Sequence, residues 1–91
     1  MAEDYNSKPS VEVFPNPMIG STTITINGLK DSGLEISFYT STGALLLTNK
    51  FETLQPVYTY EFHPDGLDEG IYYCVVRLGN EVITKRITVI R

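Results

Sequence analysis

Apolar and polar residues alternate along most of this chain, in short runs that each end at turn-forming residues. Such alternation places successive side chains on opposite faces of an extended strand, and short runs separated by turns are typical of β-sandwiches and barrels. No window keeps the apolar period of about 3.6 residues that a helix would show. The pattern predicts seven strands, over residues 11–14, 22–26, 34–39, 44–51, 58–62, 71–78 and 81–90.

Two of these runs also predict positions within a sheet. Residues 71–78 are apolar on both faces, which is typical of a central strand, whereas residues 44–51 are expected to place Leu45 and Leu47 on one face. The connections are short, and Gly79-Asn80 suits a tight hairpin turn, so neighbouring strands should run antiparallel. We therefore predict an all-β fold, a seven-stranded antiparallel immunoglobulin-like sandwich. It would span residues 10–91 after a flexible tail over residues 1–9.

The composition agrees with one globular domain. The 91 residues are 42% hydrophobic and 20% charged, and a chain of this length can bury a core without a disulfide or a metal. The net charge of −4 would repel phosphate backbones, so nucleic acid is not an expected partner. No apolar run approaches the roughly 18 residues of a membrane helix, so direct membrane insertion is not expected. Residues 1–10 lack the basic start and apolar stretch of a signal peptide.

Side chains with reactive chemistry are few. The one histidine, His63, precedes a turn, and the one cysteine, Cys74, lies in an apolar strand, where a thiol is expected to be buried and inert. Asp65, Asp68 and Glu69 share a loop that suits either a calcium ion or a solvated acidic turn, and their spacing lacks the EF-hand pattern. We therefore predict no catalytic residue, no metal and no cofactor. The chain is expected to act by binding or by being recognised, and not as an enzyme.

Residues 68–74 spell Asp-x-Gly-x-Tyr-x-Cys, which is the pattern of the tyrosine corner in immunoglobulin domains. Gly70 permits a sharp bend, and the hydroxyl of Tyr72 can bond back to the loop backbone. The other immunoglobulin markers are missing, because residues 22–26 hold no cysteine and residues 34–39 hold no tryptophan. The sequence thus predicts the corner but does not support the disulfide-bonded immunoglobulin family.

Four segments, in this order, resemble one known family: Phe14-Pro15-Asn16-Pro17, residues 38–46, residues 60–72 and residues 84–89. Together they are similar to the C-terminal sorting domain of the type IX (Por) secretion system of Bacteroidetes, over residues 11–91. The resemblance departs from the family pattern at two places. An aspartate often seen near Ser41-Thr42 is missing, and Cys74 is an unusual occupant of its apolar position.

The resemblance implies a secretion signal at the end of a longer protein, whose upstream passenger would bring the signal peptide. After transit through the periplasm, the outer-membrane translocon would recognise the folded domain. A cell-surface sortase-like peptidase would then remove it, by cleavage in or before the stretch that ends at Ser10, and leave the passenger secreted or on the cell surface. The recognition candidates that the resemblance implies are Pro15, Asn16, Pro17, Gly43, Gly70, Tyr72, Lys85 and Arg86.

Each candidate also has a purely structural interpretation. Gly43 and Gly70 suit turns, and Tyr72 suits packing. Lys85 and Arg86 suit recognition and edge protection equally, because a basic residue on an edge strand deters pairing with another chain.

A second function also stays open at this point, an immunoglobulin- or fibronectin-like accessory module at the end of a secreted enzyme. Such a module would grip polysaccharide or protein through Tyr39, Tyr58 or Tyr60. Tyrosines on strands are more often explained by core and rim packing. The closing residues 85–91 favour the sorting signal.

Overall fold

The computed structural model describes residues 9–28, 33–52 and 56–90, which form seven strands and, within those ranges, no helix. Every predicted strand is confirmed, and the strand ends differ from the prediction by at most one residue. No helix suited to crossing a membrane occurs among the described residues. The strands are β1 (Ser10–Phe14), β2 (Thr22–Asn27), β3 (Gly33–Thr40), β4 (Leu45–Glu52), β5 (Val57–Phe62), β6 (Gly70–Leu78) and β7 (Glu81–Val89).

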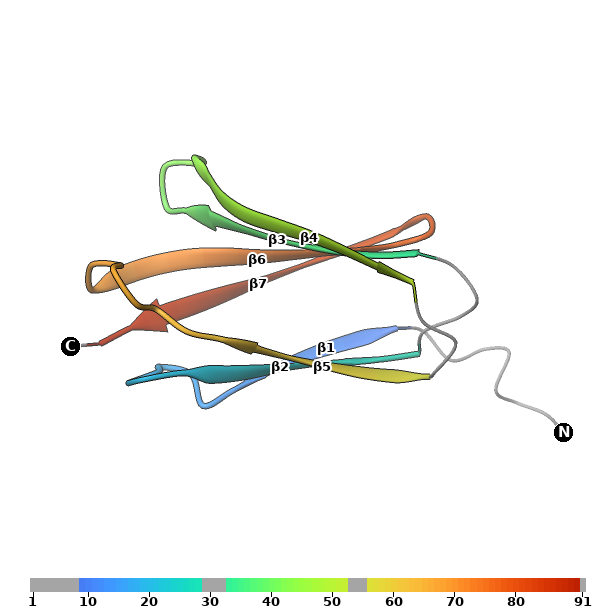
Figure 1. The fold of residues 1–91 in the computed structure, drawn as a ribbon, viewed down its shortest axis with the longest axis horizontal. Helices are drawn as coiled ribbons and strands as arrows, with labels where there is room; N and C mark the ends of the chain where they lie inside the picture. Colours follow the sequence, from blue (N-terminus) through green and yellow to red (C-terminus); the bar gives the residue numbers. More distant parts are fainter. Residues whose placement is uncertain (1–8, 29–32, 53–55, 91) are drawn as a thin grey trace, which may run out of the picture.

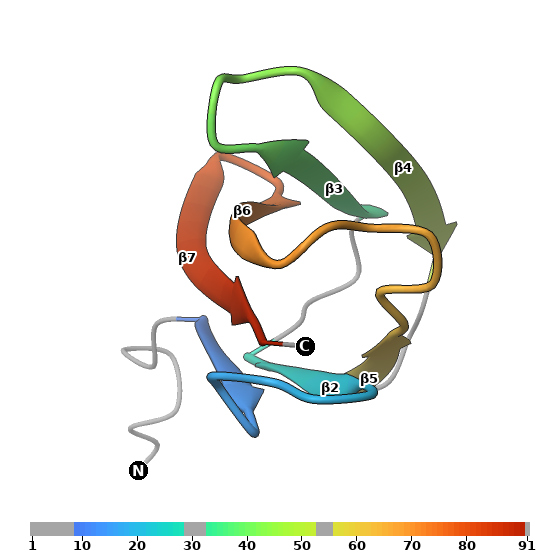
Figure 2. The same ribbon diagram turned by 90° about the vertical axis from the view of Figure 1, so that its left-hand side faces the viewer.

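The strands form two antiparallel sheets that pack face to face (Figure 1). The smaller sheet has the order β1-β2-β5, and the larger one has the order β4-β3-β6-β7. Seen from one end, the two sheets curve around a common interior (Figure 2). β6 lies inside its sheet, as its apolar faces predict, and β7 is an edge strand of the same sheet.

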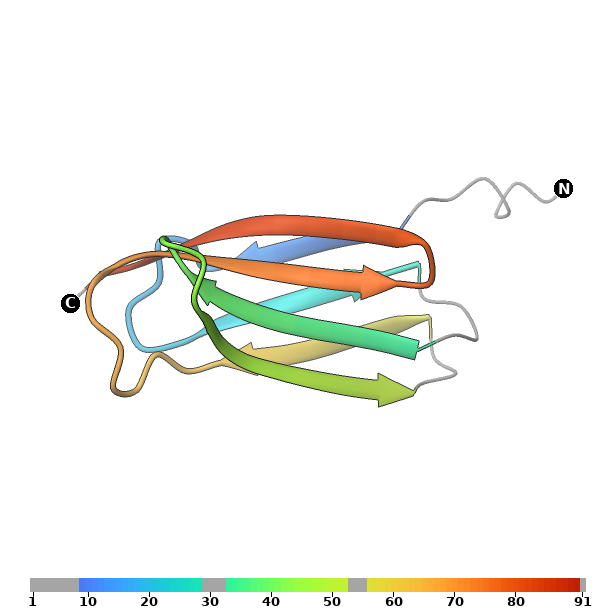
Figure 3. The same cartoon turned by 90° about the horizontal axis from the view of Figure 1, so that it is seen from above.

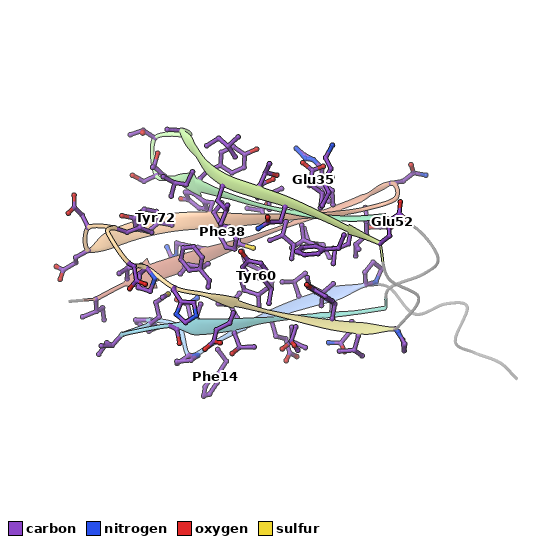
Figure 4. The ribbon with its side chains drawn as sticks, in the orientation of Figure 1. Phe14, Glu35, Phe38, Glu52, Tyr60 and Tyr72 are labelled. Atoms are coloured by element: carbon purple, nitrogen blue, oxygen red, sulfur yellow. The ribbon has the colours of Figure 1, made fainter. Side chains whose placement is uncertain are left out.

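The core consists of the inward side chains of both sheets. Phe38 of β3 is fully buried at its centre, and its ring stacks on Phe62 of β5 at a centroid distance of 4.3 Å. Figure 4 shows Phe38 and Tyr60 between the sheets, whereas Phe14 points away from the smaller sheet. The other buried apolar residues are Val11, Met18, Ile24, Ile26, Leu34, Ile36, Tyr72, Cys74, Val76, Leu78, Ile87 and Val89.

Aromatic side chains close the side of the sandwich where β4 faces β5. Tyr58 and Tyr60 point inward and are half-buried, and the ring of Phe51 lies 4.9 Å and 6.2 Å from their centroids. Asn49 Nδ2 donates a hydrogen bond of 3.0 Å to the hydroxyl oxygen of Tyr60. These contacts confirm the packing interpretation of both tyrosines, which leaves neither of them as an open platform for a sugar ring.

The prediction that Leu45 and Leu47 share a face is wrong. The register of β3 and β4 shifts between Phe38 and Tyr39, so Leu47 lies opposite Phe38 and Leu45 lies opposite Tyr39. Phe38 and Tyr39 point to opposite faces of β3, and directly opposed residues share a face. The two leucines are therefore on opposite faces, because the extra residue of a β-bulge reverses the alternation that the sequence suggests.

Candidate recognition site at one end of the sandwich

The chain leaves the smaller sheet directly after Phe14. Pro15 and Pro17 have no backbone N–H, so this segment cannot continue the ladder with β2. The peptide bonds that precede both prolines are cis. The hydroxyl of Thr22 donates a hydrogen bond of 2.7 Å to the carbonyl oxygen of Pro15, which holds the segment at the point where it turns away. The chain then crosses to the edge of the larger sheet.

Asn16 joins this segment to β7. Its Nδ2 donates to the carbonyl oxygen of Arg86 at 2.7 Å, and its Oδ1 accepts from the backbone N–H of Thr88 at 3.0 Å. The side-chain amide thus pairs with the strand edge as a backbone peptide would. Met18 continues the pairing, because its N–H donates to the carbonyl oxygen of Thr88 at 2.8 Å and its carbonyl oxygen accepts from Ile90 N–H at 3.0 Å. We call residues 15–18 the clasp.

The predicted tyrosine corner is present and lies beside the clasp. The hydroxyl of Tyr72 donates to the carbonyl oxygen of Asp68 at 2.7 Å, and the tyrosine ring is buried. Gly70 has a φ of 152°, a conformation that side chains rarely adopt. Gly70 lies opposite Val89 in the ladder of β6 and β7, and Val89 forms a parallel bridge with Met18 of the clasp. The corner and the clasp therefore hold the end of β7 from both sides.

Removal of the corner hydroxyl tests this arrangement. We expect Tyr72→Phe to lower the free energy of unfolding by about 1 kcal/mol, the usual contribution of one hydrogen bond. Urea unfolding of the purified domain would measure it. Tyr73→Phe is the matched control, since no described residue forms a hydrogen bond with the Tyr73 hydroxyl. A loss as large in Tyr73→Phe as in Tyr72→Phe would contradict the assigned role.

Gly43 serves the turn between β3 and β4. It has a φ of 97°, and its N–H donates to the carbonyl oxygen of Thr40 at 3.0 Å. Thr40 N–H in turn donates to the carbonyl oxygen of Ala44 at 2.9 Å, and Thr40 Oγ1 accepts from Ala44 N–H at 3.0 Å. These contacts account for a glycine at this position. The turn lies at the same end of the sandwich as the clasp, but on the far side of the larger sheet (Figure 2).

Lys85 and Arg86 are both exposed on β7, at the border of the clasp. They point to opposite faces of the strand, with Lys85 opposite Cys74 and Arg86 opposite Tyr73 on β6. The fold thus brings Asn16 to Arg86 across 70 residues of sequence, through the Arg86 backbone. This placement fits both interpretations of the two side chains, recognition by a partner and protection of the edge strand against pairing.

The sequence pattern does not single out Met18, Thr22 or Thr88, although each helps to hold the clasp in place. Met18 is fully buried, and an apolar residue directly after the second proline is the one local signal that could have indicated this. Phe14 and Ile19, which flank the clasp in sequence, are 77% and 75% exposed. Single exposed apolar side chains are common on protein surfaces, so these two are positions for substitution near the clasp and do not by themselves define a contact site.

The reactive side chains do not form a catalytic arrangement within the described residues. His63 is exposed, with its Nε2 3.7 Å from Glu61 Oε1, and Cys74 is buried in the core. Burial raises the pKa of the Cys74 thiol to about 12, so the thiol stays protonated and a poor nucleophile at neutral pH. No three potential metal ligands come together in the described part of the chain.

Fold and site together define a small antiparallel two-sheet domain in which residues 15–18, the clasp, hold the last strand. The sequence model of the family described as the secretion system C-terminal sorting domain matches residues 12–90. No curated protein matches the chain. A solved structure of dimeric latent PorU from Porphyromonas gingivalis is similar in fold, with a TM-score of 0.66 and 22% identity. The match covers 90% of this chain and 9% of that one.

The chain belongs to the family of secretion system C-terminal sorting domains. It is a C-terminal sorting signal for type IX secretion, as the sequence resemblance predicts. A signal of this kind implies interaction with the secretion machinery and with a passenger domain, and export to the cell surface or secretion. The family is one of sorting signals and not of enzymes.

Proposed function

We propose that the outer-membrane translocon of the type IX system recognises this domain in its folded state, after transit through the periplasm, at the clasp end of the sandwich. The observation that carries the proposal is the convergence of sequence candidates there. Asn16 and Arg86 share a hydrogen bond, and Tyr72 anchors the corner that enters the neighbouring strand. Gly43 lies apart from this group and serves its own turn.

The path of the chain supports this orientation. β1 begins at the end of the sandwich where β6 turns into β7, and β7 finishes at the opposite end, beside the clasp (Figure 3). A passenger joined ahead of Ser10 would therefore extend from the end away from the clasp. The clasp end would stay clear for a partner while the passenger is attached.

We also propose the finer fold assignment and the fate of the domain. The three-plus-four strand order and the tyrosine corner support an immunoglobulin-like sandwich. A sortase-like peptidase at the cell surface would cut in or before the stretch that ends at Ser10, because a protease needs an extended, accessible chain. The backbone is paired with β2 from Ser10 onward and Val11 is buried in the core, which favours residues 10–91 as the unit removed.

The test is export of a reporter. A periplasm-directed reporter fused to residues 11–91 should appear outside a bacterium that has a type IX system, and the reporter alone should stay in the periplasm. Ile19→Asp should lower export of the fusion, because it places a charge on the exposed apolar surface beside the clasp. Val57→Asp is the control, as Val57 is also exposed but begins β5 at the other end. Retention of the wild-type fusion in the periplasm would refute the proposal.

A further inference from the structure

The clasp covers only part of the free edge of β7. Backbone groups of Arg86, Thr88 and Ile90 bond to the clasp, which shows that these residues direct their N–H and C=O groups away from β6. Strand residues alternate in this respect, so Val82 and Thr84 present their N–H and C=O groups on the same side. β7 is the edge strand of the larger sheet there, and β1 of the smaller sheet lies beneath it in the view of Figure 3.

No described residue forms a hydrogen bond with the outward backbone groups of Val82 and Thr84. Together with the N–H of Arg86 they make an unpaired edge from Val82 to Arg86, which we call the open edge. Unpaired edges of this kind are templates on which an extended segment can add as a further strand. The clasp fixes one limit of such a segment, because Asn16 already occupies the next position along β7.

The open edge is better suited to strand addition than the other edge of the same sheet. β7 pairs with β6 in unbroken register from Glu81 to Val89, so its backbone is regular. β4, the opposite edge strand, is interrupted by the register shift at its leucines. A bulge of that kind twists an edge and disrupts further pairing.

The charges around the open edge indicate what would bind there. Among the described residues, every lysine and arginine lies on the larger sheet, and two of the four, Lys85 and Arg86, lie on the open edge. They project to opposite faces, so an added strand would meet a cation on each face at its clasp end. Val82, which is 58% exposed, offers an apolar contact at the other end. This combination fits an extended segment with carboxylates near the clasp and an apolar residue at Val82.

We infer that the open edge binds an acidic, extended segment of the secretion machinery, which adds to the larger sheet as a fifth strand beside β7. This inference rests on the proposed function and names the chemistry of its partner. Backbone hydrogen bonds to Val82, Thr84 and Arg86 hold the segment, and Lys85 with Arg86 select for its charge. Lys85 and Arg86 therefore have two roles. They deter pairing with strands that lack acidic residues, and they contact the acidic segment of the secretion machinery.

Thr84→Pro tests the inference directly. Proline at this position removes an outward N–H and places its ring where the added strand would lie, but it leaves the ladder with β6 intact. In the reporter assay we expect export to fall by at least about tenfold, from the lost hydrogen bond and the steric clash. Thr84→Val, which keeps the N–H, should be exported like the wild-type fusion. Circular dichroism of both variants would check that they are folded.

The outcomes separate this inference from the proposed function. If the wild-type fusion is not exported, the proposed function fails. If the wild-type and Thr84→Pro fusions are exported equally, the strand addition alone is overturned. Dimerisation of the purified domain that Thr84→Pro abolishes, seen by sedimentation, would assign the open edge to a second copy and overturn the acidic partner.

A measurement on the wild-type domain covers the case in which Thr84→Pro does not fold. The probe is a synthetic octapeptide with two adjacent aspartates near one end and alternating valine and threonine elsewhere, so that one carboxylate falls on each face of the added strand. The readout is amide hydrogen exchange by nuclear magnetic resonance. Millimolar peptide should slow exchange at Val82 and Thr84 by about tenfold, as new hydrogen bonds form there. The same peptide with N-methylated backbone amides should have no effect. Unchanged exchange with the first peptide would overturn the inference.

Discussion

We expect Phe38→Ala to lower the free energy of unfolding by about 3–5 kcal/mol, the range for a large aromatic side chain removed from a packed core. Phe38 has no exposed surface, and its ring contacts lie in the opposite sheet, with Phe62 at 4.3 Å and Tyr60 at 5.8 Å. The substitution therefore removes contacts that join the two sheets. Because β3 is paired with β4 on one side and with β6 on the other, its backbone cannot easily move to fill the cavity. Urea unfolding followed by circular dichroism would measure the loss.

Phe14→Ala is the matched control, because Phe14 is 77% exposed and points away from the core. It should change the free energy of unfolding by less than about 0.5 kcal/mol. Total stability of a small domain is about 5–15 kcal/mol, so Phe38→Ala removes a large share of it. If export depends on the folded domain, the reporter fused to the Phe38→Ala domain should stay in the periplasm. Equal losses for the two substitutions would contradict the placement of Phe38.

The strands could be predicted from the sequence because their alternation records which side chains are buried. In β2, Ile24 and Ile26 alternate with threonines, and both isoleucines are fully buried in the structure. The apolar run of β6 also predicted an inner strand correctly, since β6 lies between β3 and β7. Only one of its faces is covered, however, because Tyr72 and Cys74 are buried whereas Ile71 is 39% exposed. The tyrosine corner could also be predicted, because the residues that form it all lie within residues 68–74.

Two kinds of feature could not be predicted from the sequence. They are contacts between residues that are distant along the chain, and irregular pairing of strands. The bulge opposite Phe38 and Tyr39 reverses the faces of Leu45 and Leu47, and no local pattern indicates it. The contact between Asn16 and Arg86 forms only when the segment after β1, in the smaller sheet, packs against β7 of the larger sheet. From sequence, Pro15-Asn16-Pro17 and the basic pair were separate candidates, and the fold makes them neighbours.

Asn16→Ala is expected to lower the free energy of unfolding by about 1–2 kcal/mol, because it removes two hydrogen bonds from an edge that water can partly solvate. It leaves Arg86 C=O and Thr88 N–H without their partner. The open edge would then extend toward the end of β7, which would favour pairing between copies. Urea unfolding and sedimentation would measure the two effects.

Asn16→Asp separates the two hydrogen bonds. A carboxylate can still accept from Thr88 N–H, but it cannot donate to the carbonyl oxygen of Arg86 and places a negative charge against it. Hydrogen exchange at the Thr88 amide should therefore be fast in Asn16→Ala and slow in Asn16→Asp, even though both variants lose stability. Equal exchange at Thr88 in the wild type and both variants would show that the amide of Asn16 does not hold β7. In that case the clasp would be joined to β7 only through the backbone bonds of Met18, which survive either substitution.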